Sequence, residues 1–423
     1  MDIRPFRGWH YRGPEISTQI APPYDILTQA DKDAFLEADP TNIVAVDLPH
    51  CPPKSVGPDE CYKAAAKLLA RWQKKRVLFR DNKPALYAYE QSYSWCGRSY
   101  VRRAMLCGVR ATPLGVDVIP HEHTFAGPKA DRLKLTTVTK MQLSPIFGFY
   151  EDPIGVTDQL LAAAPAEPTL TAELRGVTEK LWVVTEPGVI AGIHSALEDA
   201  KVYIADGHHR YTTAMNFCQA LRDGGLIDEE HEANFVLFAL VARNDPGLLV
   251  LPTHRVIRGL DASFRFPELL EKLKGDFDLK QINPPDDLSD ADAFLEPYGK
   301  GAMALLADND VWIAQLRRPE AMAEAAPDQC DAWRTLDVAV LHKLIIEKAL
   351  APWNPREDNV EYTPNGNAAR QAARSGEAQA VVVLQGTPLQ AVEAVADAGQ
   401  AMPHKSTYFY PKLATGMILK PVE

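Results

Sequence analysis

Residues 201–221 constrain the fold of this chain more than any other segment, because they have the pattern of a strand that passes into a helix through one glycine. Residues 201–203 form a short, mostly apolar run, and residues 211–221 have the spacing of an amphipathic helix. Gly207 lies between them and lets the backbone turn sharply. Since such strand-to-helix junctions are building blocks of α/β proteins, we expect a mixed α/β fold.

The same turn carries a dense group of polar side chains: Asp206, His208, His209 and Arg210. Backbone N–H groups at a helix start lack partners and carry partial positive charge, which suits a phosphate. The imidazoles and the two-pronged guanidinium of Arg210 would add donors to such a site. Asp-Gly is also a common turn, and a His-Arg pair can be a solvated helix start. The combination nevertheless favours a ligand site.

A second polar group lies in residues 120–136, which we expect to form a loop. It comprises His121, Glu122, His123, Lys129 and Arg132. Glu122 is a candidate general base toward a hydroxyl, and the lysine and arginine could neutralise phosphate oxygens. In an extended segment the two histidines would share a face and could bind a metal. The alternative is a solvated charged loop.

A third group comes near the end of the chain and comprises Lys405, Ser406, Thr407 and Lys412. Hydroxyls beside lysines are typical partners of phosphate. The Gly-x-x-x-x-Gly-Lys pattern of a P-loop does not occur in the sequence. An aromatic strand with a lysine at each end is the alternative interpretation of this segment.

Two shorter candidates complete the set of site residues. Tyr24 and Asp25 follow two prolines, and His254 and Arg255 follow Pro252 and Thr253. Both pairs are candidates to line the site. The alternative is a turn for Tyr24 and Asp25 and a strand end for His254 and Arg255. The aromatic residues Phe125 and Tyr211 are expected to pack rather than to stack on a ligand.

Composition and charge exclude some classes of protein. The chain has 423 residues, of which 46% are hydrophobic and 24% charged, as in ordinary globular proteins, and its net charge is −11. This balance argues against a general nucleic-acid binder, although a local basic pocket remains compatible with it. No apolar run approaches the roughly 18 residues of a membrane span, and no apolar leader follows Met1. With no Cys-x-x-Cys pair among the six cysteines, a reducing, cytoplasmic setting is expected.

The chain is expected to contain a core region and two further parts. We expect an N-terminal region and phosphate-binding core over 1–260, a peripheral α/β lobe over 261–332, and a C-terminal part over 333–423 that returns to the site. Residues 161–180 are weakly patterned. The expected elements are helices over 31–38, 59–75, 187–197 and 333–350, and strands over 84–93, 99–111, 146–150, 181–184, 234–241 and 380–384.

The motif Asp206-Gly207-His208-His209-Arg210 resembles the signature of free-serine kinases built on the ParB/sulfiredoxin fold. Nearly the whole chain is similar to a bacterial and archaeal family long labelled a domain of unknown function. That wider resemblance rests on the segments 21–25, 121–124, 128–133, 144–147, 251–255 and 402–412. It implies a ParB/sulfiredoxin-like core with additional N- and C-terminal lobes, and some relatives act as serine kinases that use pyrophosphate. His208 stands where sulfiredoxins have a catalytic cysteine, which argues against sulfinic-acid reduction.

These observations and the resemblance together predict a small-molecule phosphotransferase that forms O-phospho-L-serine from free L-serine. Asp206 or Glu122 would accept the hydroxyl proton, with His208 as the third catalytic residue. The predicted phosphate-binding residues are Gly207, His209, Arg210, Lys129, Arg132, His254, Arg255, Lys405, Ser406, Thr407 and Lys412. Tyr24, Asp25, His121 and His123 are predicted to bind the substrate. The donor is pyrophosphate, ATP or ADP, accompanied by Mg²⁺, and no protein-bound metal is assigned.

Two other functions are compatible with the same residues. A metal-dependent hydrolase would use His121, His123, Asp206 and His208 to activate water. A non-enzymatic protein that responds to a nucleotide would use only the phosphate-binding turn. No membrane or nucleic-acid partner is expected, and the sequence does not specify the oligomeric state.

Overall fold

The computed structural model describes residues 1–423, except for the side chains of Ala126 and Glu357. Helices make up 34% and strands 26% of the structure, arranged in several sheets, which confirms the mixed α/β class. By its contacts the chain divides into two units: unit 1 comprises residues 1–248 and 411–423, and unit 2 comprises residues 249–410. The three regions expected from the sequence, 1–260, 261–332 and 333–423, stay a prediction. Among the described residues, no helix combines the length and apolar character needed to cross a membrane.

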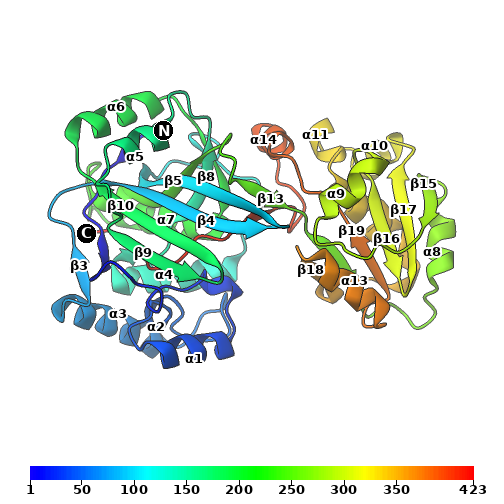
Figure 1. The fold of residues 1–423 in the computed structure, drawn as a ribbon, viewed down its shortest axis with the longest axis horizontal. Coiled ribbons are helices and arrows are strands. Elements are labelled where there is room, and N and C mark those ends of the chain that lie inside the picture. The colour runs from blue at the N-terminus through cyan, green and yellow to red at the C-terminus, as the bar shows by residue number, and fades with distance from the viewer. The chain divides into compact units, whose positions relative to one another are not determined.

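A nine-stranded mixed sheet forms the centre of unit 1 in the part of the chain that the structure describes (Figure 1). The strands run in the order β6-β11-β8-β12-β5-β4-β10-β9, and β1 pairs with β5. Every residue of β12 is buried, as expected for a strand covered on both faces. The bounds are β1 Ile3–Arg4, β4 Leu86–Trp95, β5 Arg98–Arg110, β6 Val118–Ile119, β8 Ile146–Tyr150, β9 Leu170–Leu174, β10 Val177–Val184, β11 Val202–Asp206 and β12 Phe235–Ala242.

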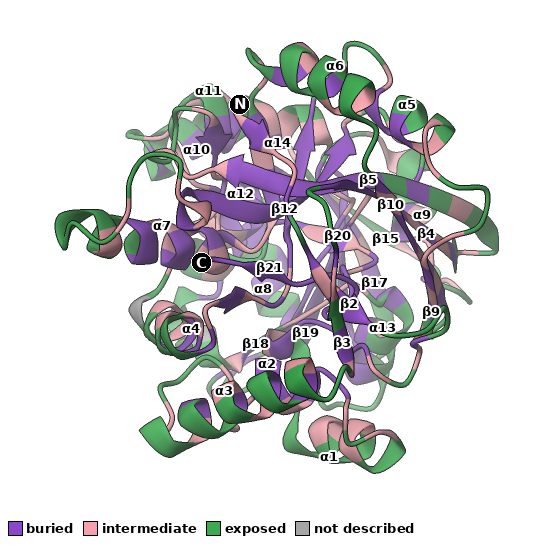
Figure 2. Ribbon diagram, turned by 90° about the vertical axis from the view of Figure 1, so that its left-hand side faces the viewer, coloured by how far each residue is buried: buried purple, intermediate pink, exposed green. Residues whose placement is uncertain are grey.

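Helices cover this sheet and turn their polar faces outward. Figure 2 shows buried strands in the interior and exposed residues along the outer sides of the helices. The main apolar core joins strand residues such as Met105 and Phe238 to Leu160 of α5 and Leu197 of α6. The helices of unit 1 are α1 Gln29–Ala38, α2 Val44–Asp47, α3 Asp59–Lys74, α4 Ala126–Thr139, α5 Val156–Ala162, α6 Pro187–Leu197 and α7 His208–Asp223, with a 3₁₀ turn η1 at Tyr24–Ile26 and another, η2, at Glu232–Asn234.

The C-terminal segment 411–423 is built into unit 1. Its strand β21 (Lys420–Pro421) pairs with β7 (Met141–Gln142), and Leu419 bridges to Trp9. Strands β2 (Trp9–Tyr11) and β3 (Leu78–Arg80) form a further small sheet. Nearly all of residues 413–422 are buried, so this segment is a fixed part of the core rather than a loose tail.

Unit 2 is built on a six-stranded sheet with the order β15-β17-β16-β19-β14-β18, and a short sheet of β13 and β20. Its strands are β13 Leu249–Leu251, β14 His254–Ile257, β15 Phe277–Ile282, β16 Met303–Ala307, β17 Asp310–Leu316, β18 Val360–Thr363, β19 Ala380–Val383 and β20 Tyr408–Tyr410. Its helices are α8 Phe266–Leu273, α9 Ala291–Leu295, α10 Glu320–Ala325, α11 Asp331–Arg334, α12 Asp337–Val340, the π-helix η4 Leu341–Ala349, α13 Gly366–Arg374 and α14 Leu389–Asp397, with 3₁₀ turns η3 Glu296–Tyr298, η5 Ala351–Trp353 and η6 Glu357–Asn359.

Two expectations about local structure are wrong, and a segment for which no structure was predicted forms strands. The expected loop 120–136 contains most of helix α4, because Gly127 and Pro128 occur in its first turn, where proline is tolerated. The weakly patterned segment 161–180 contains β9 and the start of β10. The single helix expected over 333–350 is divided, since Leu336 has an extended backbone between α11 and α12 and the last part is a π-helix.

Candidate functional site

The strand order of unit 1 brings the first two polar groups together. Strand β11 ends at Asp206 and pairs in parallel with β6, with Tyr203 opposite Ile119. Parallel neighbours end at the same edge of a sheet, and ligands of α/β proteins commonly bind at that edge. The chain after β6 therefore reaches His121 and Glu122 close to the turn that follows Asp206.

Gly207 is required at this turn for two reasons. Its φ of +98° lies in the left-handed region, which residues with a side chain rarely adopt. A Cβ atom at this position would lie 3.0 Å from Nε and 3.0 Å from Nη2 of Arg210. The guanidinium thus occupies the space beside the turn, at the N-terminal end of the 16-residue helix α7.

Two cations hold the carboxylate of Asp206. Lys412 Nζ lies 2.6 Å from Oδ1, and Arg210 Nη2 lies 2.5 Å from Oδ2. Burial raises the pKa of Asp206, but the charges of Lys412 and Arg210 outweigh burial and hold that pKa well below its ordinary value. Arg210 also donates to the carbonyl of Pro145 at 2.5 Å, which fixes the guanidinium. Asp206 therefore orients two cations and is a poor base.

A row of polar residues across three strands holds Lys412 in place. Glu179, Gln91 and Arg102 are direct cross-strand neighbours on β10, β4 and β5. Arg102 donates to the carbonyl of Pro411 at 2.6 Å, and Gln91 donates to the carbonyl of Lys412 at 3.3 Å. Gln91 also donates to Glu179 at 3.0 Å. The row thus holds the backbone of Pro411 and Lys412 and so positions the Lys412 side chain.

His208 and Glu122 lie beside the cationic turn. The backbone N–H of His121 donates to Nε2 of His208 at 3.3 Å, so the ring proton is on Nδ1, which lies 3.9 Å from Oε2 of Glu122. The rings of His121 and His208 meet edge to face with centroids 4.6 Å apart. Burial, followed by the charge of His121, lowers the pKa of His208 well below its usual range, and burial lowers the pKa of His121 to about 4. Both imidazoles are therefore neutral near pH 7.

The neighbouring residues of the motif have mixed surroundings. His209 accepts a hydrogen bond from the backbone N–H of Phe125 at 2.9 Å, and the two rings stack. His123 is exposed in the same connection. Lys129 lies in the first turns of α4, and its carbonyl accepts from Thr213 of α7 at 3.4 Å. Tyr211 packs in the core, as expected, and donates to the carbonyl of Thr112 at 2.7 Å.

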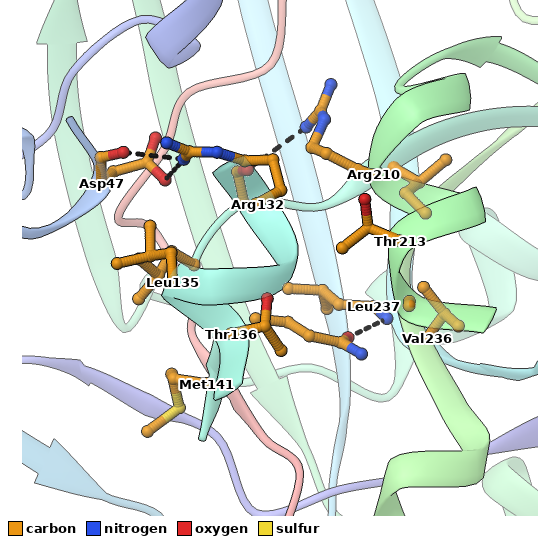
Figure 3. A pocket seen from close by; sticks show the side chains of 14 residues that line it. Asp47, Arg132, Leu135, Thr136, Met141, Arg210, Thr213, Val236 and Leu237 are labelled. Atoms are coloured by element: carbon orange, nitrogen blue, oxygen red, sulfur yellow. Dashed lines mark hydrogen bonds and ion pairs between the residues drawn. The ribbon is translucent and has the colours of Figure 1, made fainter. Parts of the chain in front are cut away.

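Arg132 belongs to a buried ion-pair cluster next to Arg210. It pairs with Asp131 at 2.7 Å and Asp47 at 3.2 Å, and its guanidinium lies 3.7 Å above the ring of Tyr24. Figure 3 shows Arg132 of α4 and Arg210 of α7 on either side of a cavity of about 50 Å³. That volume accommodates a few water molecules and is far below the several hundred Å³ of ligand pockets. A donor must therefore bind outside this cavity.

The remaining predicted residues lie elsewhere. Asp25 pairs with Lys54 at 3.6 Å, next to Tyr24. Unit 2 contains the other five predicted residues, His254, Arg255, Lys405, Ser406 and Thr407. There Arg255 donates to the carbonyl of Lys405 at 3.1 Å, and Ser406 Oγ donates to the carbonyl of Pro403 at 2.5 Å.

The four residues of the hydrolase alternative are not arranged as metal ligands. Both oxygens of Asp206 are held by cations, and Nε2 of His208 accepts a backbone hydrogen bond. Among the described residues, no group of three or more His, Cys, Asp or Glu side chains is placed to hold a metal ion.

Sequence reasoning missed the supporting residues. Glu179, Gln91 and Arg102 are buried polar residues in strands, and Asp47 is a buried acid in helix α2. Buried charges need partners, so isolated polar residues within apolar strand patterns were the available signal. The register that joins them was not readable from the chain.

Solved structures similar to this chain include three relatives at low identity. A free serine kinase (E30A mutant) in complex with AMP is 14% identical, with a TM-score of 0.34 and 69% of this chain and 83% of that chain covered. A conserved hypothetical protein from Pyrococcus furiosus is 14% identical, with a TM-score of 0.32 and coverages of 72% and 92%. C-terminally truncated SbnI from Staphylococcus aureus is 12% identical, with a TM-score of 0.34 and coverages of 73% and 85%. These likenesses are too distant to assign an activity.

No curated protein matches the chain. A family model does match: DUF1015, described as a protein of unknown function, aligns with residues 3–339, which is more than half of the chain. This match agrees with the family expected from the sequence, and the chain therefore belongs to the DUF1015 family of proteins of unknown function.

Proposed function

We propose that this protein is a phosphotransferase that moves a phosphoryl group onto the hydroxyl of a small metabolite, with free L-serine as the acceptor. The observation that carries the proposal is the cationic turn: Arg210 and Lys412 converge on one carboxylate at the start of helix α7. Three elements of charge recognition coincide there, namely two cations and the N–H groups of a helix N-terminus. The acceptor is suggested by the resemblance of the Asp206–Arg210 motif to free-serine kinases.

In the proposed reaction, Arg210 and Lys412 neutralise non-bridging oxygens of the donor phosphate. The serine hydroxyl oxygen forms a bond to phosphorus, the bond from phosphorus to the leaving phosphate oxygen breaks, and Glu122 accepts the hydroxyl proton. Glu122 is a better candidate than Asp206 for this step, because Asp206 is held ionised by two cations. Neutral His208 lies beside Glu122, with Nδ1 3.9 Å from Oε2.

The Mg²⁺ expected with the donor does not fit this residue set. Asp206, the acid nearest the cationic turn, already gives both oxygens to Lys412 and Arg210. We therefore assign no Mg²⁺ ligand in unit 1. ATP, ADP and pyrophosphate present the same phosphate oxygens to the turn, so the donor stays a matter for experiment.

The test is an assay of O-phosphoserine formation from serine with ATP, ADP or pyrophosphate in the presence of Mg²⁺, run also in reverse. Arg210→Lys should lose about 2–4 kcal/mol of transition-state stabilisation, because the fork to the phosphate is lost. Arg222→Lys, near the end of the same helix, is the matched control and should keep full turnover. Absence of product with every donor would contradict the serine kinase proposal, and full activity of Arg210→Lys would remove Arg210 from the site.

A further inference from the structure

Arg255 in unit 2 is a buried cation, and none of the carboxylates that the structure describes pairs with it. Its side chain is 0% exposed, and the guanidinium contacts the carbonyls of Lys405 at 3.1 Å and His404 at 3.5 Å. It also lies 3.4 Å from Nε2 of His342 and 4.7 Å from the ring centre of Tyr362. Nε of Arg255 has no hydrogen-bond partner among the described residues. Burying a charge without a counter-ion is costly, so this position calls for an anion.

A cavity lies directly beside this arginine. His342, Tyr362 and His404, which contact Arg255, are part of its wall, and the cavity encloses about 580 Å³. This volume falls within the usual range of small-molecule sites. The other lining residues are Trp333, Lys343, Ile346, Glu347, Ala351, Asn354, Pro355, Val360 and Pro403.

The charges around the cavity favour an anion on the Arg255 side. Burial, followed by the charge of Arg255, lowers the pKa of His342 to about 4, and burial lowers the pKa of Arg255 to about 10. Lys343 adds a further cation, and Glu347, the one acid among the described lining residues, pairs with it at 2.7 Å. Trp333 and Ile346 provide an apolar surface in the same cavity.

We propose that this cavity binds a small organic phosphate, with its phosphate group toward Arg255 and His342 and its apolar or aromatic body against Trp333 and Ile346. A phosphate at this end of the cavity would supply counter-charge to Arg255 across the wall residues and would accept a hydrogen bond from His342, which lines the cavity. The site is built from unit 2 alone and goes beyond the proposed transfer reaction. All its lining residues except Trp333 lie after residue 339, beyond the family match.

The test is calorimetric titration of the full chain with phenyl phosphate, phenol and inorganic phosphate. Phenyl phosphate should bind, and phenol and inorganic phosphate should each bind at least tenfold more weakly. His342→Phe, which keeps an aromatic ring, should weaken phenyl phosphate binding at least tenfold, and Lys343→Ala severalfold. Lys274→Ala is the matched control, because it removes an exposed lysine that also pairs with a glutamate, Glu271. That variant should bind as the wild type does.

Several results would overturn the proposal. One is no detectable binding of phenyl phosphate to the wild type. Another is equal affinity in the wild type, His342→Phe and Lys343→Ala. If phenol binds as tightly as phenyl phosphate, the cavity does not recognise the anion. If inorganic phosphate binds as tightly as phenyl phosphate, the cavity does not recognise the organic part of the ligand. Weakening by Arg210→Lys alone would place the binding in unit 1. Because these readouts are affinities, they are independent of whether serine is phosphorylated.

Discussion

The sharpest test of the site geometry is Gly207→Ala compared with Gly225→Ala. Both glycines have positive φ, +98° and +63°, and an alanine in a left-handed backbone costs about 1–2 kcal/mol. The new Cβ at 207 would meet the Arg210 guanidinium at 3.0 Å, whereas at 225 nothing lies within 4 Å. The two variants therefore share the backbone strain, and only the first disturbs Arg210.

We expect both variants to lose about 1–2 kcal/mol of unfolding free energy, and Gly207→Ala to lose about 1 kcal/mol more as the Arg210–Asp206 hydrogen bond weakens. Denaturant unfolding measures this difference. Turnover should fall about tenfold to hundredfold in Gly207→Ala alone, because a positioned donor is displaced rather than deleted. Independently of turnover, NMR titration should show a raised Asp206 pKa in Gly207→Ala only. Equal stability, equal turnover and an unchanged Asp206 pKa in the two variants would refute the reasoning.

Three further predictions concern other residues of unit 1. Glu122→Gln should lower turnover roughly 10²–10⁴-fold in steady-state assays while donor affinity is kept, and wild-type turnover would exclude Glu122 as the base. Lys412→Met should lower the unfolding free energy by about 1–2 kcal/mol. This loss is smaller than that for breaking a fully buried ion pair, because both side chains are partly exposed and Arg210 still pairs with Asp206. An unchanged urea midpoint would contradict this prediction. Burial raises the pKa of Glu179 from 4.5 to about 7, so the native state keeps a proton that the unfolded state releases, and stability should fall by about 3 kcal/mol as the pH rises from 4.5 to 7. Urea unfolding of Glu179→Gln across this range should show a much flatter profile, and an equally steep one would assign the dependence to another group.

The strand-to-helix turn was predictable because all of its signals are local. An apolar run, one glycine and an amphipathic pattern define β11 and α7 within three residues of their observed bounds. Helix α4 was not predictable in the same way. Its polar first turns contain Gly127 and Pro128. The sequence of α4 has no clear amphipathic pattern, and the helix packs against α3 and α7. Leu336 interrupts the helix expected over 333–350 although no glycine or proline marks the break, so tertiary packing overrides propensity there.

The composition of the candidate site was predictable in part, and its geometry was not. The sequence indicated Asp206, Arg210 and Glu122 by residue type and position. It did not indicate that Lys412 would pair with Asp206 while Lys405 of the same segment belongs to unit 2. That separation depends on where the chain re-enters unit 1. It also did not indicate that both carboxylate oxygens of Asp206 pair with cations. Because of these pairs, we expect Asp206 to position the two cations rather than to act as the base.

The discontinuity of unit 1 sets the order in which a ribosome can complete it. Residues 1–248 are synthesised first, but their partner segment 411–423 emerges only after all of residues 249–410. Until then β7 lacks its neighbour β21, and Asp206 lacks Lys412. The nascent chain must therefore keep an incomplete core while unit 2 is translated, and the charge cluster closes only after unit 2 has been synthesised. A product that terminates early would carry every residue of the Asp206–Arg210 motif and still lack the second cation, so the motif alone does not mark a finished molecule.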